Sequence, residues 1–217
     1  MRKLFFLGVL LFMNISVMAE PVKLLVFGDS LSVGHHLDAT ESFCSQLEQE
    51  LTKKGYHIQV LNYSKSGETT AGAVEKVKDM LFRNPDGVLL QLGSNDAFQN
   101  VPVKTTTANL QTLISFFTKR NIPVFLIGME APVTMSPEYR EDFRKMYANL
   151  ATENELLLYP FFMEGLWNED GTNRSKDYFL EDKIHPSPKG VKIMVKHILP
   201  AVEQFIQEDV ADVVIEK

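Results

Sequence analysis

Four short polar segments contain groups that could act together on a carbonyl carbon. Ser30 ends the tripeptide Gly28-Asp29-Ser30 directly after an apolar run, and Asp182 precedes His185 by three residues. A histidine can take the proton of a serine hydroxyl when a carboxylate fixes its tautomer. These residues therefore predict a nucleophile, a base and an orienting acid. The alternatives are ordinary turn chemistry around Ser30 and a surface pair at Asp182 and His185.

The other two segments contain hydrogen-bond donors for an oxyanion. Gly67 has no Cβ, so its N–H can approach a substrate closely. The side-chain amide of Asn95 has two N–H groups. The backbone N–H of Ser30 adds a third donor if a helix begins there. The alternatives are a turn glycine at Gly67 and a helix cap formed by Asn95 and Asp96.

The elements that must position these segments alternate along the chain. Apolar runs predict strands at 22–27, 57–61, 88–92, 123–128 and 156–159. Helical spacing of apolar residues predicts helices at 41–54, 69–82, 103–120, 138–154 and 187–207. This alternation predicts a three-layer α/β/α sandwich with a flavodoxin-like, five-stranded parallel sheet. Because loops after parallel strands share one edge, the four polar segments can converge.

The segments and their order resemble the SGNH (GDSL) hydrolase superfamily. Within it, the chain is most similar to the bacterial group of arylesterases, acyl-CoA thioesterases and lysophospholipases. The resemblance covers nearly all of the chain after residue 19. It is carried by the stretches VFGDSLSVGHHLD, LNYSKSGETTAGA, LLQLGSNDA, FLIGMEAP, YPFFMEGL and DKIHPSPKG.

The resemblance implies a role for each matching residue. It makes Ser30 the nucleophile, with Gly67 and Asn95 as oxyanion donors. It makes His185 the base and Asp182 its orienting acid, on a flavodoxin-like fold. The expected activity is hydrolysis of a small-molecule ester, thioester or lysophospholipid through an acyl-enzyme, without a cofactor.

Some residues depart from the family pattern near the expected site. Ser94 stands where the third block commonly has glycine, and Lys183 stands where glycine commonly follows the acid. The segment 130–136 lacks the common arginine and Asn-Tyr-Gly, and the stretch 167–179 is longer than usual. These departures affect the expected substrate preference and leave every catalytic group in place.

Two other functions compete with ester or thioester hydrolysis. A carbohydrate or peptidoglycan O-acetyl esterase or acyltransferase has the same four blocks, because the acceptor site lies in the loops. A non-catalytic binding module of the cell envelope belongs to another class. Its mark would be the loss of the serine, asparagine or histidine, and none is lost.

Composition and charge bound the remaining possibilities. The 217 residues are 45% hydrophobic with a net charge of −6, which suits one globular domain and argues against general nucleic-acid binding. Residues 1–19 resemble a signal peptide, with a basic start, an apolar stretch shorter than the ~20 residues of a spanning helix, and Val17-Met18-Ala19 before the cleavage point. We therefore expect export to the periplasm or medium without stable membrane insertion. The domain is expected at 20–217, with a loosely packed tail at 208–217, and the sequence does not set the oligomeric state.

The lone cysteine and a pair of histidines have simple expected roles. Cys44 is the only cysteine, so no intramolecular disulfide can form, and its place on a helical apolar pattern predicts a small buried residue. His35 and His36 lie close to Ser30, but no metal site is expected because they lack further ligands at suitable spacing.

Overall fold

The computed structural model describes residues 20–168 and 174–211. The expected signal peptide at 1–19 lies outside the described residues. The strands are β1 (Val22–Gly28), β2 (Ile58–Asn62), β3 (Gly87–Gln91), β4 (Val124–Ile127) and β5 (Leu158–Tyr159). The α-helices are α1 (Ser30–Val33), α2 (Phe43–Lys53), α3 (Thr70–Lys76), α4 (Ser94–Phe98), α5 (Val103–Thr118), α6 (Pro137–Glu153) and α7 (Pro188–Phe205). Short 3₁₀ turns occupy Ala39–Glu41, Val77–Arg83 and Lys176–Tyr178, and a π-helical turn covers Ile206–Val210.

The five strands form one parallel sheet in the order β2-β1-β3-β4-β5. Strand β1 lies between β2 and β3, and it pairs Leu25 with Leu61 of β2 and with Val88 of β3. Strands β3 and β4 are buried along their whole length, as expected for a sheet covered on both faces. The structure confirms the predicted flavodoxin-like sandwich.

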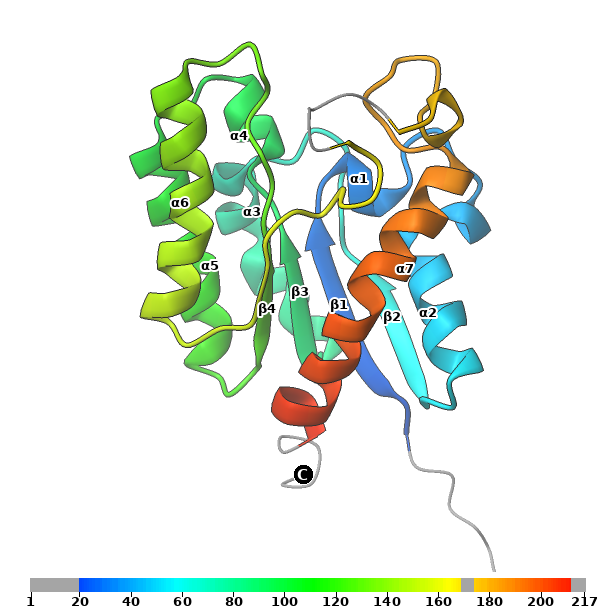
Figure 1. Cartoon of the computed structure of the whole chain (residues 1–217). Helices are drawn as coiled ribbons and strands as arrows, with labels where there is room; N and C mark the ends of the chain where they lie inside the picture. Colours follow the sequence, from blue (N-terminus) through cyan, green and yellow to red (C-terminus); the bar gives the residue numbers. More distant parts are fainter. Residues whose placement is uncertain (1–19, 169–173, 212–217) are drawn as a thin grey trace, which may run out of the picture.

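The helices form the two outer layers of the sandwich (Figure 1). Helices α2 and α7 pack against each other on one side, and α3, α5 and α6 form a second connected group. The strand arrows in Figure 1 all point toward the end of the molecule where α1 lies. The loops that follow β1, β2, β3 and β4 therefore meet at one edge, where the polar segments were expected to converge.

Helix α2 shows how the apolar pattern produces this packing. The Ser42 side chain accepts a hydrogen bond from the Ser45 N–H and caps the helix. Phe43, Leu47 and Leu51 are fully buried toward the core. Cys44 is buried beside them, as predicted, and this burial raises the pKa of its thiol.

The predicted helix at 69–82 is only partly α-helical. It changes to a 3₁₀ turn after Lys76, where Val77 and Met80 are buried and Phe82 is 83% exposed. The three-residue spacing of the two buried side chains fits three residues per turn. The chain therefore departs from the predicted α-helix because the 3₁₀ turn buries Val77 and Met80 on the same side.

The tail expected to pack loosely, at 208–217, includes one residue that reaches the core. Val210 is fully buried. It lies so close to Gly87, at the start of β3, that a Cβ at that position would crowd it. Residues 212–217 lie outside the described part of the chain. No helix among the described residues is both long enough and apolar enough to cross a membrane.

Candidate active site

Ser30, His185 and Asp182 form one continuous hydrogen-bonded chain. The Ser30 Oγ lies 2.9 Å from the His185 Nε2. On the other side of the ring, the His185 Nδ1 lies 2.7 Å from the Asp182 Oδ2. This arrangement lets the imidazole accept the serine proton at Nε2 while the carboxylate holds the proton on Nδ1. Asp182, rather than Asp29, therefore orients the histidine.

Asp29 instead holds the turn that presents Ser30. Ser30 is the first residue of α1, and the Asp29 Oδ1 caps this helix by accepting a 3.0 Å hydrogen bond from the Leu31 N–H. Beneath the turn, the Gln91 Oε1 accepts hydrogen bonds from the Asp29 N–H at 3.3 Å and from the Ser32 hydroxyl at 2.8 Å. Burial raises the pKa of Asp29, against the lowering effect of its hydrogen bonds. Ser30 thus lies on a turn that is fixed from below by buried polar groups.

A tight loop before α7 places Asp182 and His185. The Asp182 Oδ1 accepts hydrogen bonds from the backbone N–H groups of Ile184 at 2.8 Å and His185 at 2.9 Å. The turn requires a left-handed backbone at Lys183, whose φ is 59°. This strain occurs where the family pattern commonly has glycine, which adopts such angles more easily. The loop is closed by a hydrogen bond from the Leu180 N–H to the His185 carbonyl at 2.8 Å.

The same contacts keep Asp182 ionised. Desolvation alone raises the pKa of this carboxyl, but hydrogen bonds from the backbone of His185 and Ile184 and from the His185 ring outweigh it. The pKa falls from 3.8 to about 2. The carboxylate therefore remains negatively charged throughout the neutral range and can stabilise a positive imidazole.

The two other oxyanion candidates, Gly67 and Asn95, are brought next to each other. One N–H of the Asn95 amide donates to the carbonyl of Glu68, the residue after Gly67, at 3.0 Å. The second N–H of the amide remains available to a substrate. Gly67 has a φ of +77°, and a Cβ there would meet open space, so its backbone faces an unobstructed region. Within the described residues, no acceptor pairs with the Gly67 N–H.

Buried hydrogen bonds hold the Gly67 segment against its neighbours. Asp96 is fully buried, and its carboxylate accepts hydrogen bonds from the Thr70 N–H at 2.8 Å and the Thr70 hydroxyl at 2.5 Å. On the other side, the Lys65 N–H donates to the Gly28 carbonyl at 3.1 Å. The segment is therefore tied both to the Asn95 turn and to the strand that leads to Ser30.

A comparison with protein families identifies the chain. The model of the GDSL-like lipase/acylhydrolase family matches residues 26–193, a range that includes all five predicted site residues. The chain belongs to this family. It is a hydrolase of the SGNH type, as the resemblance in the sequence implied.

Individual relatives of this hydrolase support the assignment. An arylesterase of Vibrio mimicus is 31% identical over 185 residues, which cover 84% of this chain and 90% of the relative. The thioesterase 1/protease 1/lysophospholipase L1 of Escherichia coli is 28% identical over 192 residues, or 88% of each chain. The crystal structure of AlinE4, an SGNH-hydrolase family esterase, matches with a TM-score of 0.71 and 31% identity. That match covers 86% of this chain and 97% of AlinE4.

The GDSL hydrolase has supporting residues that the sequence patterns did not single out. Gln91 lies in an apolar strand, and its only signal was a polar side chain among buried neighbours. Tyr147 in α6 donates its hydroxyl to the Leu92 carbonyl at 2.8 Å, just before the Asn95 turn. At Gly93, φ is +126° and a Cβ would overlap this hydroxyl, so glycine is required there. Tyr147 had no sequence signal that distinguished it from other core residues.

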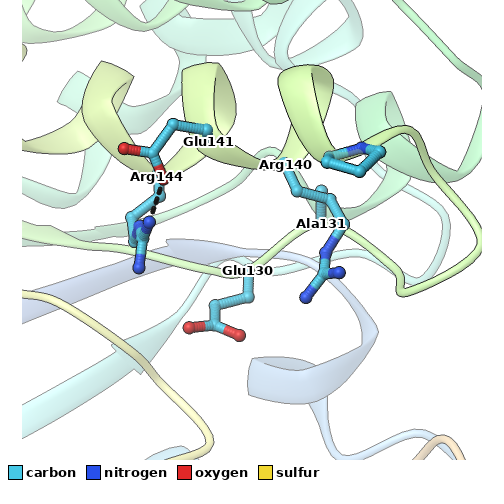
Figure 2. Close-up of a pocket in the computed structure, with 6 residues that line it drawn as sticks. Glu130, Ala131, Arg140, Glu141 and Arg144 are labelled. Atoms are coloured by element: carbon cyan, nitrogen blue, oxygen red, sulfur yellow. Dashed lines mark hydrogen bonds and ion pairs between the residues drawn. The ribbon is translucent and has the colours of Figure 1, made fainter.

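A pocket of about 230 Å³ lies where the segment after β4 meets α6 (Figure 2). Glu130 lies between Arg140 and Arg144 in this view, and Arg144 pairs with Glu141. Neither Glu130 nor Arg140 forms an ion pair with any described residue. The pocket thus includes Glu130 and Ala131, part of the segment in which this hydrolase departs from the common family pattern.

His35 and His36, near Ser30, do not belong to a cluster of metal-ligating side chains within the described residues. No cluster of three or more histidine, cysteine, aspartate or glutamate side chains in residues 20–168 and 174–211 could hold a metal ion. His35 lies against His36 and His185, and its contacts are with rings and a hydroxyl group.

Proposed function

We propose that the protein is an exported serine hydrolase that cleaves carboxylic ester or thioester bonds through an acyl-enzyme on Ser30. The observation that carries the proposal is the hydrogen-bonded chain from Asp182 through His185 to the Ser30 hydroxyl. This chain lies at the edge of the sheet where Gly67 and Asn95 supply hydrogen-bond donors. The activities named for the arylesterase and thioesterase/lysophospholipase relatives support the same reaction class.

Each step has a group to perform it. The Ser30 Oγ attacks the acyl carbon as its proton moves to the His185 Nε2. The N–H groups of Ser30 and Gly67 and the free N–H of Asn95 stabilise the tetrahedral oxyanion. The bond to the leaving group breaks, and His185 returns the proton to the departing alcohol or thiol. Water then attacks the acyl-enzyme with His185 as base, releasing the acid and restoring Ser30.

Export is the second part of the proposal. It is supported by the basic and apolar pattern of residues 1–19 and by Val17-Met18-Ala19 before Glu20. Fractionation of cells that express the full chain would test it. Mature protein in the periplasm or medium, with Glu20 at its N-terminus, is the expected result, and uncleaved protein in the cytoplasm would contradict it.

A fluorophosphonate probe tests the nucleophile. We expect mass spectrometry of the labelled, folded protein to show one adduct on Ser30, and we expect none in the Ser30→Ala variant. Turnover of p-nitrophenyl esters should fall to background in the same variant. An unlabelled Ser30, or equal rates in the two proteins, would reject the mechanism and favour a binding module.

A series of substrates then separates the hydrolase classes. Rates for p-nitrophenyl and acyl-CoA esters of increasing chain length would establish an arylesterase, thioesterase or lysophospholipase preference. Measurable turnover of longer acyl chains is the expected result. A uniformly near-zero response in protein that still labels at Ser30 would instead favour O-acetyl groups of carbohydrate or peptidoglycan as substrates.

A further inference from the structure

His35 packs directly against the imidazole of His185, although the proposed mechanism gives it no task. The centroids of the two rings are 4.7 Å apart, and their planes are inclined by 51°. A second contact places His35 against His36, at 3.9 Å and 47°. His35 is therefore in contact with the proposed base while also belonging to the segment that follows the nucleophile.

The backbone around His35 is fixed relative to Ser30. Gly34 caps the C-terminus of helix α1 with a φ of +81°, and the N–H groups of Gly34 and His35 both donate to the Ser30 carbonyl. The next residue, His36, has a φ of +60°, which few residues other than glycine adopt. This tight turn fixes the backbone position of His35 and orients its side chain toward His185.

The His35 ring also contacts the segment that contains Gly67. The His35 Nδ1 lies 3.1 Å from the hydroxyl of Ser66, the residue before Gly67. One side chain thus touches both the proposed base and the neighbour of a proposed oxyanion donor. Among the residues that the structure describes, only His35 has a hydrogen bond or ring contact with both.

A ring in this place can restrain a motion that the triad leaves free. The hydrogen bonds at the Nδ1 and Nε2 of His185 lie near the plane of its ring, so they oppose tilting about the line between these atoms only weakly. The side chain of His185 is 19% exposed. We propose that His35 is a positioning residue that holds the His185 imidazole toward Ser30 and links it through Ser66 to the Gly67 segment. This inference rests on the proposed function of the triad.

The electrostatic surroundings of His35 suit this task. Desolvation lowers the pKa of His35, and the charges of His36 and His185 lower it further, while Asp182 opposes the shift. These groups and the Ser66 hydroxyl are the polar partners that face its ring. A neutral His35 does not repel the positive imidazole that forms at His185 during each proton transfer.

Kinetics of substitutions at His35 provide the first test. We expect His35→Ala to lower kcat about tenfold, since small misplacement of a reacting group is costly, with KM changed less than about threefold. His35→Phe keeps a ring against His185 and should restore most of kcat. His57→Ala is the matched control, because this exposed histidine precedes β2 at the opposite edge of the sheet, and its rate should equal that of the wild type.

A second measurement does not depend on turnover. The NMR signal of the proton between the His185 Nδ1 and Asp182 should be sharp in the wild type and in His35→Phe, and broadened by exchange with solvent in His35→Ala. A fixed charge gives a further readout. His35→Arg should move the acid limb of kcat/KM to lower pH, because a cation beside the ring opposes protonation of His185.

The outcomes distinguish this inference from the proposed function. Absence of a fluorophosphonate adduct on Ser30 of the wild type would reject the proposed function, whereas the NMR signal would still report the effect of His35. Wild-type kcat and an unchanged signal in His35→Ala would overturn the positioning role. A loss in His35→Phe equal to that in His35→Ala would also overturn it. Unfolding midpoints of all variants show whether a loss of kcat merely reflects unfolded protein.

Discussion

Asn95 divides its two amide hydrogens between the fold and the proposed reaction. One is held by the Glu68 carbonyl at 3.0 Å, which fixes the side chain and directs the other hydrogen elsewhere. A donor that is already oriented requires no rearrangement when negative charge develops on the substrate. The hydrogen bond to Glu68 is therefore part of the reason why Asn95 can serve as an oxyanion donor.

Replacing Asn95 tests this role at the level of one side chain. We expect Asn95→Ala to lower kcat about 10²–10³-fold with a small change in KM, because the lost interaction forms mainly in the transition state. Steady-state kinetics with a p-nitrophenyl ester measure the changes in kcat and KM. Asn149→Ala, on the exposed side of α6, is the control. A loss confined to KM would assign Asn95 to substrate binding instead.

The low pKa of Asp182 predicts how stability depends on pH. An unfolded aspartate titrates near pH ~3.9, whereas Asp182 in the fold has a pKa of about 2. The ionised form is thus favoured by folding, so its contribution is complete above pH ~4 and is lost as the pH falls toward 2. Because the carboxyl is partly exposed, the effect is modest.

Asp182→Asn should remove this contribution. Urea unfolding between pH 5 and 2 should therefore show a smaller loss of unfolding free energy in the variant than in the wild type. The opposite order, with the variant losing more stability over this range, would mean that the carboxylate is not stabilised by its hydrogen bonds.

At the level of elements, the turn between β3 and α4 depends on one glycine. Gly93 has a φ of +126° and lies against the Tyr147 hydroxyl. We expect Gly93→Ala to lower the unfolding free energy by about 1–3 kcal/mol, through backbone strain and overlap, and to displace Asn95. Gly67→Ala is the comparison, because its Cβ would enter open space and only backbone strain would remain.

Denaturant unfolding of the two variants checks this difference. Gly93→Ala should be the less stable, and adding Tyr147→Phe should recover part of its loss because the overlap with the hydroxyl is removed. Equal losses at the two glycines would show that strain alone, without overlap, accounts for the effect.

The pocket between the β4 loop and α6 predicts a preference among substrates. Glu130 and Arg140 present opposite charges that no described residue pairs, so a zwitterionic leaving group can contact both. Arg140→Gln and Glu130→Gln should each raise KM for a lysophospholipid about fivefold, the value of ~1 kcal/mol for an exposed charge pair. KM for a neutral p-nitrophenyl ester should not change.

Arg120→Gln is the control for these charge changes, because Arg120 lies just after α5 and contacts Phe116. Unchanged lysophospholipid kinetics in both pocket variants would exclude this pocket from substrate recognition.

Prediction from sequence succeeds where a local pattern of apolar and polar residues decides the structure. It fails where contacts between segments far apart in the chain decide it. The strands were located within about two residues because the apolar runs are short and end in polar residues. The five candidate site residues could be proposed because their types stand out after predicted strands or before the last predicted helix. The 3₁₀ turn after Lys76, the support of Gln91 beneath Asp29 and the ring of His35 on His185 depend on distances between separate segments. No local pattern contains those distances.

At the scale of the whole molecule, the hydrophobic core includes the last described turn, Ile206–Val210. Val210 fills space next to Gly87 and Phe205, at the start of β3. Val210→Ala should lower the unfolding free energy by about 2 kcal/mol, because two buried methyl groups are removed and the resulting cavity can close only in part. Glu208→Ala, two residues earlier and exposed, should cost much less. Equal losses would mean that the turn contributes no core packing.

The serine and histidine of the proposed triad are separated by 155 positions in the chain. His185 is also placed by a loop that leads into α7, which packs against α2 near the beginning of the fold. A chain that is still being synthesised, or that crosses a membrane unfolded, therefore carries its nucleophile without its base. Hydrolysis begins only once both ends of the chain have folded together. If the proposed triad carries the activity, the order of the chain thus makes hydrolysis depend on complete folding.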